Sequence, residues 1–311
     1  MAPRSAVSPY LLLTLAPLFW ACNWIIGRSL VAEVPPLAMT FYRWLFASVI
    51  LVPFALPHVR RDWPRIRAHW RVLVVLAVLG GAAHNALAYV GLAHTTATNG
   101  VILNSFIPVM IVALSWLVLR ERLRRPQMLG IAVSLAGVLA IIADGSLHKL
   151  ATLSLNTGDL VIVASMAMWS LYTIALRWKP QGLHMLSFLF VIALVGNVAV
   201  FPFYLGEMAL GARVIWSWQS VASILAVALF SSVLAYLFWN WGVEAVGANV
   251  AGLFIHLMPA FGIVLAWALL GERLEAYHIV GIALILAGIW ITSRHRRPRP
   301  DAQEAAAVGT D

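Results

Sequence analysis

Long apolar runs recur along the whole chain, and they constrain its fold more than any other feature. A helix needs about 20 mostly apolar residues to cross a bilayer. The ten runs in this chain are centred near Trp20, Ala47, Val78, Met110, Val133, Ala167, Ala193, Leu229, Gly262 and Ala283. Only 11% of the residues are charged, against about 25% in ordinary soluble domains. The pattern predicts an all-α membrane protein with ten transmembrane helices.

Two other interpretations of these runs fit less well. A transmembrane β-barrel needs segments of about 10 residues in which apolar and polar residues alternate. The first run could be a secretory signal peptide, because Arg4 precedes it and residues 20–22 resemble a cleavage site. However, the apolar stretch continues to Ile26, and a bulky Trp stands where a cleavage site requires small residues. We therefore expect the first run to be a retained span.

The basic residues are distributed unequally between the predicted loops. With ten spans and a cytoplasmic N-terminus, four of the 21 lysines and arginines are external, namely Arg28, Lys149, Arg213 and Arg273. Sixteen are cytoplasmic, and Arg43 lies near a span. This positive-inside pattern predicts a multi-pass membrane protein with both termini in the cytoplasm. Topology thus explains the net charge of +9, and we expect no nucleic-acid partner.

The second half of the chain repeats the first. Residues 120–139 read RERLRRPQMLGIAVSLAGVL, and residues 271–290 read GERLEAYHIVGIALILAGIW. The same offset of 151 residues relates Gly91 to Gly242, Pro108 to Pro259, Trp116 to Trp267 and Gly137 to Gly288. Each copy contains five spans, an odd number, so the second copy enters the membrane upside down. The arginine-rich loop is then cytoplasmic, whereas its arginine-poor copy is external.

This repeat predicts the domain organisation. Inverted repeats are the architecture of secondary transporters, whose substrate site lies near the midplane between the halves. We expect a first five-helix repeat over residues 10–143, a second over residues 157–293, and a basic, then polar, cytoplasmic tail over residues 294–311.

Several motifs carry a resemblance to a known family. These are the paired ERL phrases followed by G and AG, the proline in the preceding span, FWACNW at 19–24 and PPLAMTFYR at 35–43. Together they resemble the drug/metabolite transporter superfamily, in its ten-span branch with two EamA-type repeats. The resemblance extends from about Leu11 to Ser293 and is closest to bacterial exporters of aromatic and other amino acids.

The resemblance implies a function. It implies a secondary transporter that exports aromatic and other neutral amino acids, or related small metabolites, by alternating access, as facilitated diffusion or exchange. Similar members move drugs, purines or sugar derivatives, so these substrates and proton-coupled antiport are the alternatives. The expected partners are a small-molecule substrate and membrane lipid, while the coupling ion and oligomeric state are left open.

Polar side chains inside the predicted spans are candidates for a substrate site, because such groups are costly in a bilayer unless they line a cavity or find partners. Asn85 and Tyr89 stand four residues apart in the third span, hence on one helical face. The offset of 151 maps them to Tyr236 and Asn240, the same residue types in reverse order. We therefore expect an amide and a phenol on each wall of the interface.

Further residues complete the predicted substrate site. An offset of 149 relates Trp20 to Trp169 and Asn23 to Tyr172 in the first and sixth spans. The remaining candidates are His84, Asn104, Trp239 and His256. The alternative is a packing role, because Trp and Tyr often mark the membrane interface, while Asn and lone His side chains often join helices.

Three residues are candidates for gating. Arg43 lies early in the second span, toward the external face, and the second half has no counterpart to it. It could snorkel to the interface, or it could contribute to an outer gate or a carboxylate contact. Pro108 and Pro259 each remove a backbone donor and clash with the carbonyl four residues earlier. They are predicted to be either a pair of hinges or static kinks.

The sequence gives an enzyme little support. It contains no HExxH, no pair of intramembrane aspartates, no GxSxG and no GxxxxGK. We expect no cofactor and no metal, and we take the single cysteine, Cys22, as a small apolar residue. A passive channel is the other functional class to be distinguished.

The acidic residues bear on the mechanism. All 12 are predicted to lie in loops, in tails or at span ends, so an acidic proton relay at mid-membrane is not expected. Neutral donors and acceptors would then hold an amino-acid zwitterion, with its ammonium near Trp or Tyr faces.

Overall fold

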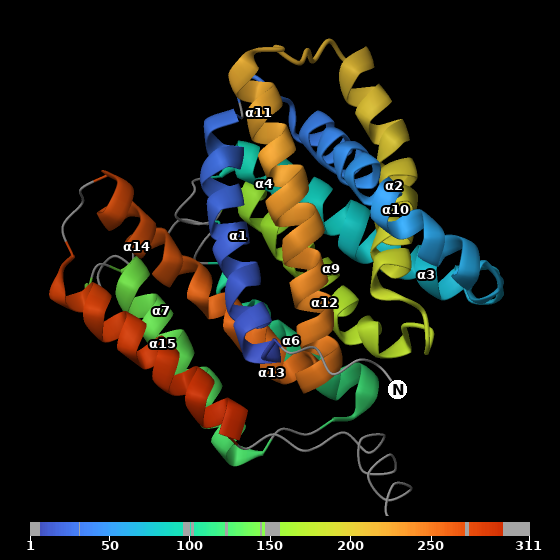
Figure 1. The fold of residues 1–311 in the computed structure, drawn as a ribbon. Coiled ribbons are helices and arrows are strands. Elements are labelled where there is room, and N and C mark those ends of the chain that lie inside the picture. Colours follow the sequence, from blue (N-terminus) through green and yellow to red (C-terminus); the bar gives the residue numbers. More distant parts are fainter. Residues whose placement is uncertain are drawn as a thin grey trace, which may run out of the picture.

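The apolar segments form helices that pack into one bundle (Figure 1). The computed structural model describes residues 7–30, 32–95, 100, 103–121, 124–143, 145–146, 156–270 and 274–294. Within these residues, nine helices are long and apolar enough to cross a membrane, and a shorter apolar helix, Ile107–Leu119, represents the fourth predicted span. The ten predicted runs therefore each contain a helix.

The helices divide into two series. The first half contains α1 (Pro9–Leu30), α2 (Pro36–Ala68), α3 (Trp70–Leu76), η1 (Ala77–Ala83), α4 (His84–His94), α6 (Ile107–Leu119) and α7 (Arg125–Ile142). The second half contains α9 (Thr157–Ala175), η2 (Leu176–Trp178), α10 (Met185–Ala209), α11 (Trp218–Ala226), η3 (Val227–Leu234), α12 (Ala235–Val246), α13 (Ala248–Leu253), η4 (Phe254–His256), α14 (Leu257–Leu270) and α15 (Ala276–Arg294).

The packing of these helices follows the repeat. The helix α2 packs against its own copy, α10, and α7 packs against its own copy, α15. Other contacts occur in pairs that the repeat exchanges: α4 packs against α9 as α12 packs against α1, and α6 packs against α9 as α14 packs against α1. Figure 1 shows the α7–α15 pair on one side of the bundle and the α2–α10 pair on the other. The predicted fold class, ten transmembrane helices in two inverted five-helix repeats, is confirmed.

Glycines bring α7 and α15 into close contact. A Cβ atom placed on Gly137 would lie 2.5 Å from the carbonyl oxygen of Gly281, and one placed on Gly281 would lie 2.7 Å from the carbonyl oxygen of Gly137. Gly130 and Gly288 approach each other in the same reciprocal way. Small residues allow helix backbones to approach closely in membranes, where association depends on packing. The glycines shared by the two copies therefore define this interface.

Two carboxylates join α2 and α10 reciprocally. Glu207, near the end of α10, accepts hydrogen bonds from the backbone N–H groups of Leu37 and Ala38 in the first turn of α2 (3.1 and 2.8 Å). Asp62, near the end of α2, accepts one from the backbone N–H of His184, which precedes α10 (2.9 Å). Each helix therefore caps the start of its copy, which requires α2 and α10 to run antiparallel.

Candidate substrate site

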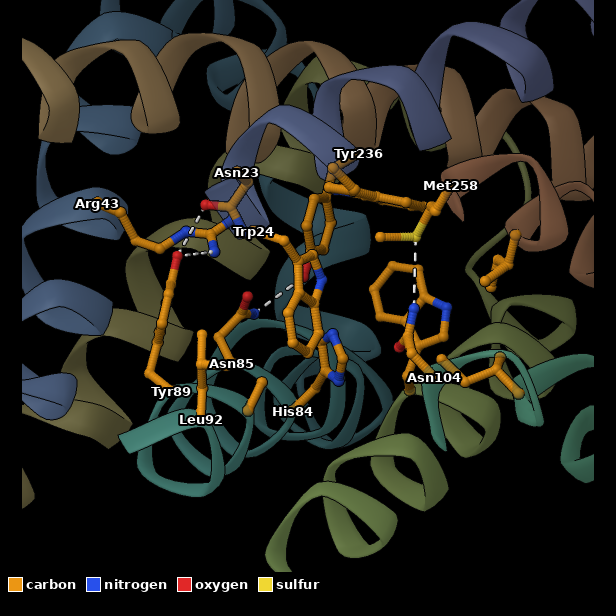
Figure 2. Close-up of a pocket in the computed structure, with 15 residues that line it drawn as sticks. Asn23, Trp24, Arg43, His84, Asn85, Tyr89, Leu92, Asn104, Tyr236 and Met258 are labelled. Atoms are coloured by element: carbon orange, nitrogen blue, oxygen red, sulfur yellow. Dashed lines mark hydrogen bonds between the residues drawn. The ribbon is translucent and has the colours of Figure 1, made fainter. Parts of the chain in front are cut away.

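A small cavity lies between the two halves, in the middle of the bundle. Its volume is about 50 Å³. The residues that line it are Trp20, Asn23, Trp24, Arg43, His84, Asn85, Ala88, Tyr89, Leu92, Asn104, Ile107, Trp169, Tyr236, Ile255 and Met258. Figure 2 shows polar groups from α1, α2, α4 and α12 pointing toward one another around it.

The centre of the site lies where two repeat-related residues meet. The amide nitrogen of Asn85 donates to the hydroxyl of Tyr236, 151 residues later, at 3.0 Å (Figure 2). Both side chains also donate to the carbonyl oxygen of Gly80, at 2.9 and 2.6 Å. The pseudo-twofold axis that relates the halves therefore passes between Asn85 and Tyr236. The two residues contact each other directly and do not stand on opposite walls.

The Gly80 carbonyl accepts these bonds because it lies in a π-helical segment. The segment η1 interrupts the third span, and η3 interrupts the eighth at the equivalent position. In η3 the carbonyl of Ser231, which is the repeat counterpart of Gly80, accepts a hydrogen bond from the indole of Trp20 (3.1 Å). Single-turn π-helical bulges occur frequently at functional sites. Here they supply backbone acceptors beside the cavity.

Two amide–phenol pairs flank this centre. The hydroxyl of Tyr89 donates to the amide oxygen of Asn23 at 2.8 Å, and the hydroxyl of Tyr172 donates to that of Asn240 at 2.8 Å. The repeat relates the two pairs and exchanges their residue types. In the first half the phenol lies on the third span, whereas in the second half it lies on the sixth.

Four aromatic rings cluster beside the cavity, and those of Trp20, Trp169 and Tyr236 line it. Trp20 contacts Trp169 edge to face, with ring centroids 5.0 Å apart and an interplanar angle of 85°. Tyr236 and Trp239 pack against both indoles. These four side chains are at most 9% exposed, so the aromatic cluster is closely packed.

Arg43 reaches the cavity from α2. Its side chain is 2% exposed, so the snorkelling interpretation is wrong. Its Nε donates to the hydroxyl of Ser232 at 2.9 Å, and one terminal nitrogen donates to the hydroxyl of Tyr89 at 3.1 Å. A guanidinium group is thus held inside the membrane part of the bundle.

The intramembrane histidines are hydrogen-bonded to neighbouring helices. Nδ1 of His84 lies 2.9 Å from the hydroxyl of Ser165. His256 lies 2.7 Å from the hydroxyl of Ser134 through Nδ1 and 2.8 Å from the carbonyl of Ser105 through Nε2. Within the described part of the chain, no group of three or more His, Cys, Asp or Glu side chains could hold a metal ion.

Comparison with known proteins decides the family. The model of the EamA-like transporter family matches residues 7–143 and again residues 156–294, one copy in each half. The chain belongs to the EamA-like transporter family. It is therefore a transporter of the drug/metabolite transporter superfamily, as the motifs predicted.

Relatives of this EamA-like transporter match over nearly their whole length. The uncharacterized transporter YyaM of Bacillus subtilis is 27% identical over 96% of this chain and 98% of its own. Protein PecM of Dickeya dadantii is 25% identical over 94% of this chain and 97% of its own. A crystal structure of another protein superposes with a TM-score of 0.73 at 18% identity, covering 94% of this chain and 100% of that one, and shows the same fold.

The structure brings together only part of the predicted site. The predicted residues that line the cavity of this EamA-like protein are Trp20, Asn23, Arg43, His84, Asn85, Tyr89, Asn104, Trp169 and Tyr236. The predicted residues that lie outside its lining are Tyr172, Trp239, Asn240 and His256. All four are buried, and Tyr172 and Asn240 bond to each other. Trp24 and Met258 line the cavity but were not predicted, although Trp24 directly follows Asn23 in the FWACNW motif.

The two prolines lie at helix starts. The helix α6 begins at Ile107, so Pro108 occupies its first turn, where a backbone N–H would have no intrahelical partner. Pro259 is the third residue of α14 and follows the 3₁₀ turn η4. Contrary to expectation, Pro108 therefore does not interrupt a running α-helix. The hinge role of both prolines stays a prediction.

Proposed function

We propose that this EamA-like transporter exports aromatic and other neutral amino acids, or related small metabolites, across the bacterial inner membrane by alternating access. One observation carries the proposal: a cavity at the interface of the two inverted halves is lined by indole and phenol rings from both halves and by amides from the first. Small-molecule sites combine apolar and aromatic walls with a few placed polar groups.

The lining chemistry matches an amino acid with a large side chain. Trp20 and Trp169 offer ring faces for an apolar or aromatic side chain and for the ammonium group. The side chains of Asn23, Asn85 and Tyr89 offer both donors and acceptors.

The small cavity favours alternating access over a continuous channel. A volume of about 50 Å³ holds only a few water molecules, so substrate entry requires the halves to move apart. Arg177 of the second half pairs with Glu121 of the first at 3.0 Å, and this pair joins the halves at the predicted cytoplasmic end. Rocking of one half against the other would open each end in turn.

The positions of the carboxylates favour facilitated diffusion or exchange over proton antiport. Among the residues that line the cavity there is no Asp or Glu. Asp62 and Glu207 serve as helix caps at the ends of α2 and α10. Proton-coupled transporters usually place such groups inside the membrane.

Counterflow in proteoliposomes tests this function. Vesicles preloaded with unlabelled phenylalanine should accumulate labelled phenylalanine faster than empty vesicles, because only a carrier shows trans-stimulation. Asn85→Ala should reduce the rate about tenfold or more, because it removes an amide that lines the cavity and the hydrogen bond that this amide donates to Tyr236. Gln219→Ala, which removes an exposed amide in α11, is the matched control and should keep the wild-type rate.

The same assay can contradict the proposal. Equal rates of labelled phenylalanine uptake by preloaded and empty vesicles would indicate a channel. Trans-stimulation by purines or sugars, without any by amino acids, would replace the proposed substrate class.

A further inference from the structure

The Arg43 guanidinium is the one charged group among the residues that line the cavity, when His84 is neutral. Its hydrogen bonds to Ser232 and Tyr89 use two of its five N–H groups. Trp44 and Tyr89 lie within cation–π range, with centroids 5.6 and 5.8 Å from the guanidinium carbon. These neighbours are all neutral, and they leave N–H groups of the fork available.

A counter-ion for Arg43 is missing from the described part of the protein. The ion pairs there join Arg65 to Asp62, Arg177 to Glu121, and Lys179 to Glu244. Burial of an unpaired charge costs several kcal/mol, and an ionisable group inside a membrane bundle is by default part of a functional site. Neutral hydroxyls and ring faces reduce this cost, but they do not neutralise the charge.

The repeat places an apolar residue at the position equivalent to Arg43. The helix α10 begins at Met185, 149 residues after the Pro36 start of α2, so Ile192 is the counterpart of Arg43. Ile192 is fully buried against Gly81, the counterpart of Ser232. The second half therefore fills the equivalent space by close apolar packing. The arginine lies in the first half and its serine partner in the second, and the repeat places an isoleucine and a glycine at the two equivalent positions.

We propose that Arg43 binds an anionic group of the substrate, and that this transporter is selective for molecules that carry a carboxylate on an apolar or aromatic body. The inference rests on the proposed function and narrows its substrate class. A guanidinium fork binds a carboxylate through two parallel N–H···O bonds. The rings of Trp20, Trp24 and Trp169 line the same cavity and can receive the apolar body. Because only the first half carries the charge, the substrate would bind in one orientation.

A charge-selective labelling experiment tests the anion site without any transport. Ala88 lines the cavity, so a single cysteine is placed there as Ala88→Cys on a Cys22→Ala background. The purified protein is held in phosphatidylcholine nanodiscs, which supply no anionic lipid. The labelling rates of an anionic and a cationic methanethiosulfonate reagent are then compared, and their ratio is divided by the same ratio for a free thiol in solution.

The expected normalised ratio is about tenfold or more in favour of the anionic reagent, because a charged cleft concentrates counter-ions. Arg43→Gln should remove this preference, and Arg43→Lys should keep it. A ratio near that of the free thiol with Arg43 intact would overturn the proposal, and so would a preference that survives in Arg43→Gln. The first comparison needs no Arg43 variant, so it does not depend on the folding of one.

A second comparison addresses the substrate class. 3-Phenylpropionate should protect the Ala88→Cys thiol from a neutral reagent better than 3-phenylpropionamide does, and Arg43→Gln should abolish that difference. Equal protection by the acid and the amide, or by neither, would contradict the carboxylate preference. Charge-selective labelling with no phenylalanine counterflow would reject amino-acid export while leaving the anion site standing.

Discussion

At the scale of single residues, the two amide–phenol pairs share one geometry but differ in their surroundings. Tyr89 bonds to Asn23 and also accepts from Arg43 beside the cavity. The hydroxyl of Tyr172 bonds to Asn240, and Tyr172 lies outside the lining of the cavity and is fully buried. The same chemical bond therefore serves the cavity in one half and helix packing in the other.

This difference predicts that replacing tyrosine with phenylalanine has a different effect at each of the two positions. Tyr172→Phe should cost about 0.5–2 kcal/mol of stability, because it leaves a buried amide oxygen without its donor, and should change the apparent KM little. Tyr89→Phe should raise the apparent KM several-fold, because it removes a partner of Arg43 inside the cavity. Thermal unfolding in detergent and counterflow kinetics measure the two effects. Similar changes of KM in both variants would contradict the assignment.

The sequence alone predicted much of this site but not its contacts. The offsets of 151 and 149 identified the Asn and Tyr residues, because equivalent positions in the two halves carry the same chemistry. Spacing could not show that Asn85 and Tyr236 meet at the axis, since helical faces give direction but not distance. It also could not show the burial of Arg43, because a long side chain near a span end can either snorkel or fold inward.

At the scale of helices, the reciprocal caps of α2 and α10 carry a stability prediction. Glu207→Ala and Asp62→Ala should each lower the free energy of unfolding by about 1 kcal/mol, because each removes the carboxylate that accepts backbone N–H groups at the start of the other helix. Glu244→Ala removes a half-exposed carboxylate that pairs with Lys179 and should have a smaller effect. Thermal unfolding in detergent compares the three. Equal losses would show that the caps contribute no more than a surface pair.

The glycine contact between α7 and α15 carries a second prediction for the helices. Gly137→Ala should destabilise the protein by about 1–3 kcal/mol, because the new methyl group would overlap the carbonyl of Gly281. In α14, a Cβ atom on Gly262 would meet nothing within 4 Å, so Gly262→Ala is the matched control and should be neutral or stabilising. The melting temperatures of the two variants and the wild type, measured under the same conditions, test this prediction. A melting temperature of Gly137→Ala equal to that of the control would contradict the close contact.

The sequence located the spans but not the irregular helical turns within them. Apolar runs have the same composition whether the helix is α or π. The sequence feature that η1 and η3 share is a pair of small residues at equivalent positions, Gly80–Gly81 and Ser231–Ser232. The prolines indicated irregular backbone at the correct places. Their position at the start of α6 and α14 could not be predicted, because a proline fits both the first turn of a helix and a kink.

At the scale of the whole molecule, the fold was predictable because two independent patterns agree. Apolar runs predicted the number of spans, and the unequal placement of arginine predicts their direction in the membrane. Because each copy has an odd number of spans, the second copy must be inverted relative to the first. The antiparallel pairing of α2 with α10 agrees with this inversion. The site between the halves follows from this symmetry, whereas Arg43, which donates to Ser232, departs from it and gives the cavity its charge.

The most direct test of two inverted halves is the sidedness of their matching loops. Single cysteines at Arg124 and at Glu275, each on a Cys22→Ala background, are treated in intact cells with a membrane-impermeant maleimide. The inverted repeat predicts that the cysteine at 275 labels in intact cells, and that the cysteine at 124 labels only after the membrane is opened. Labelling of both positions from the same face would contradict the account.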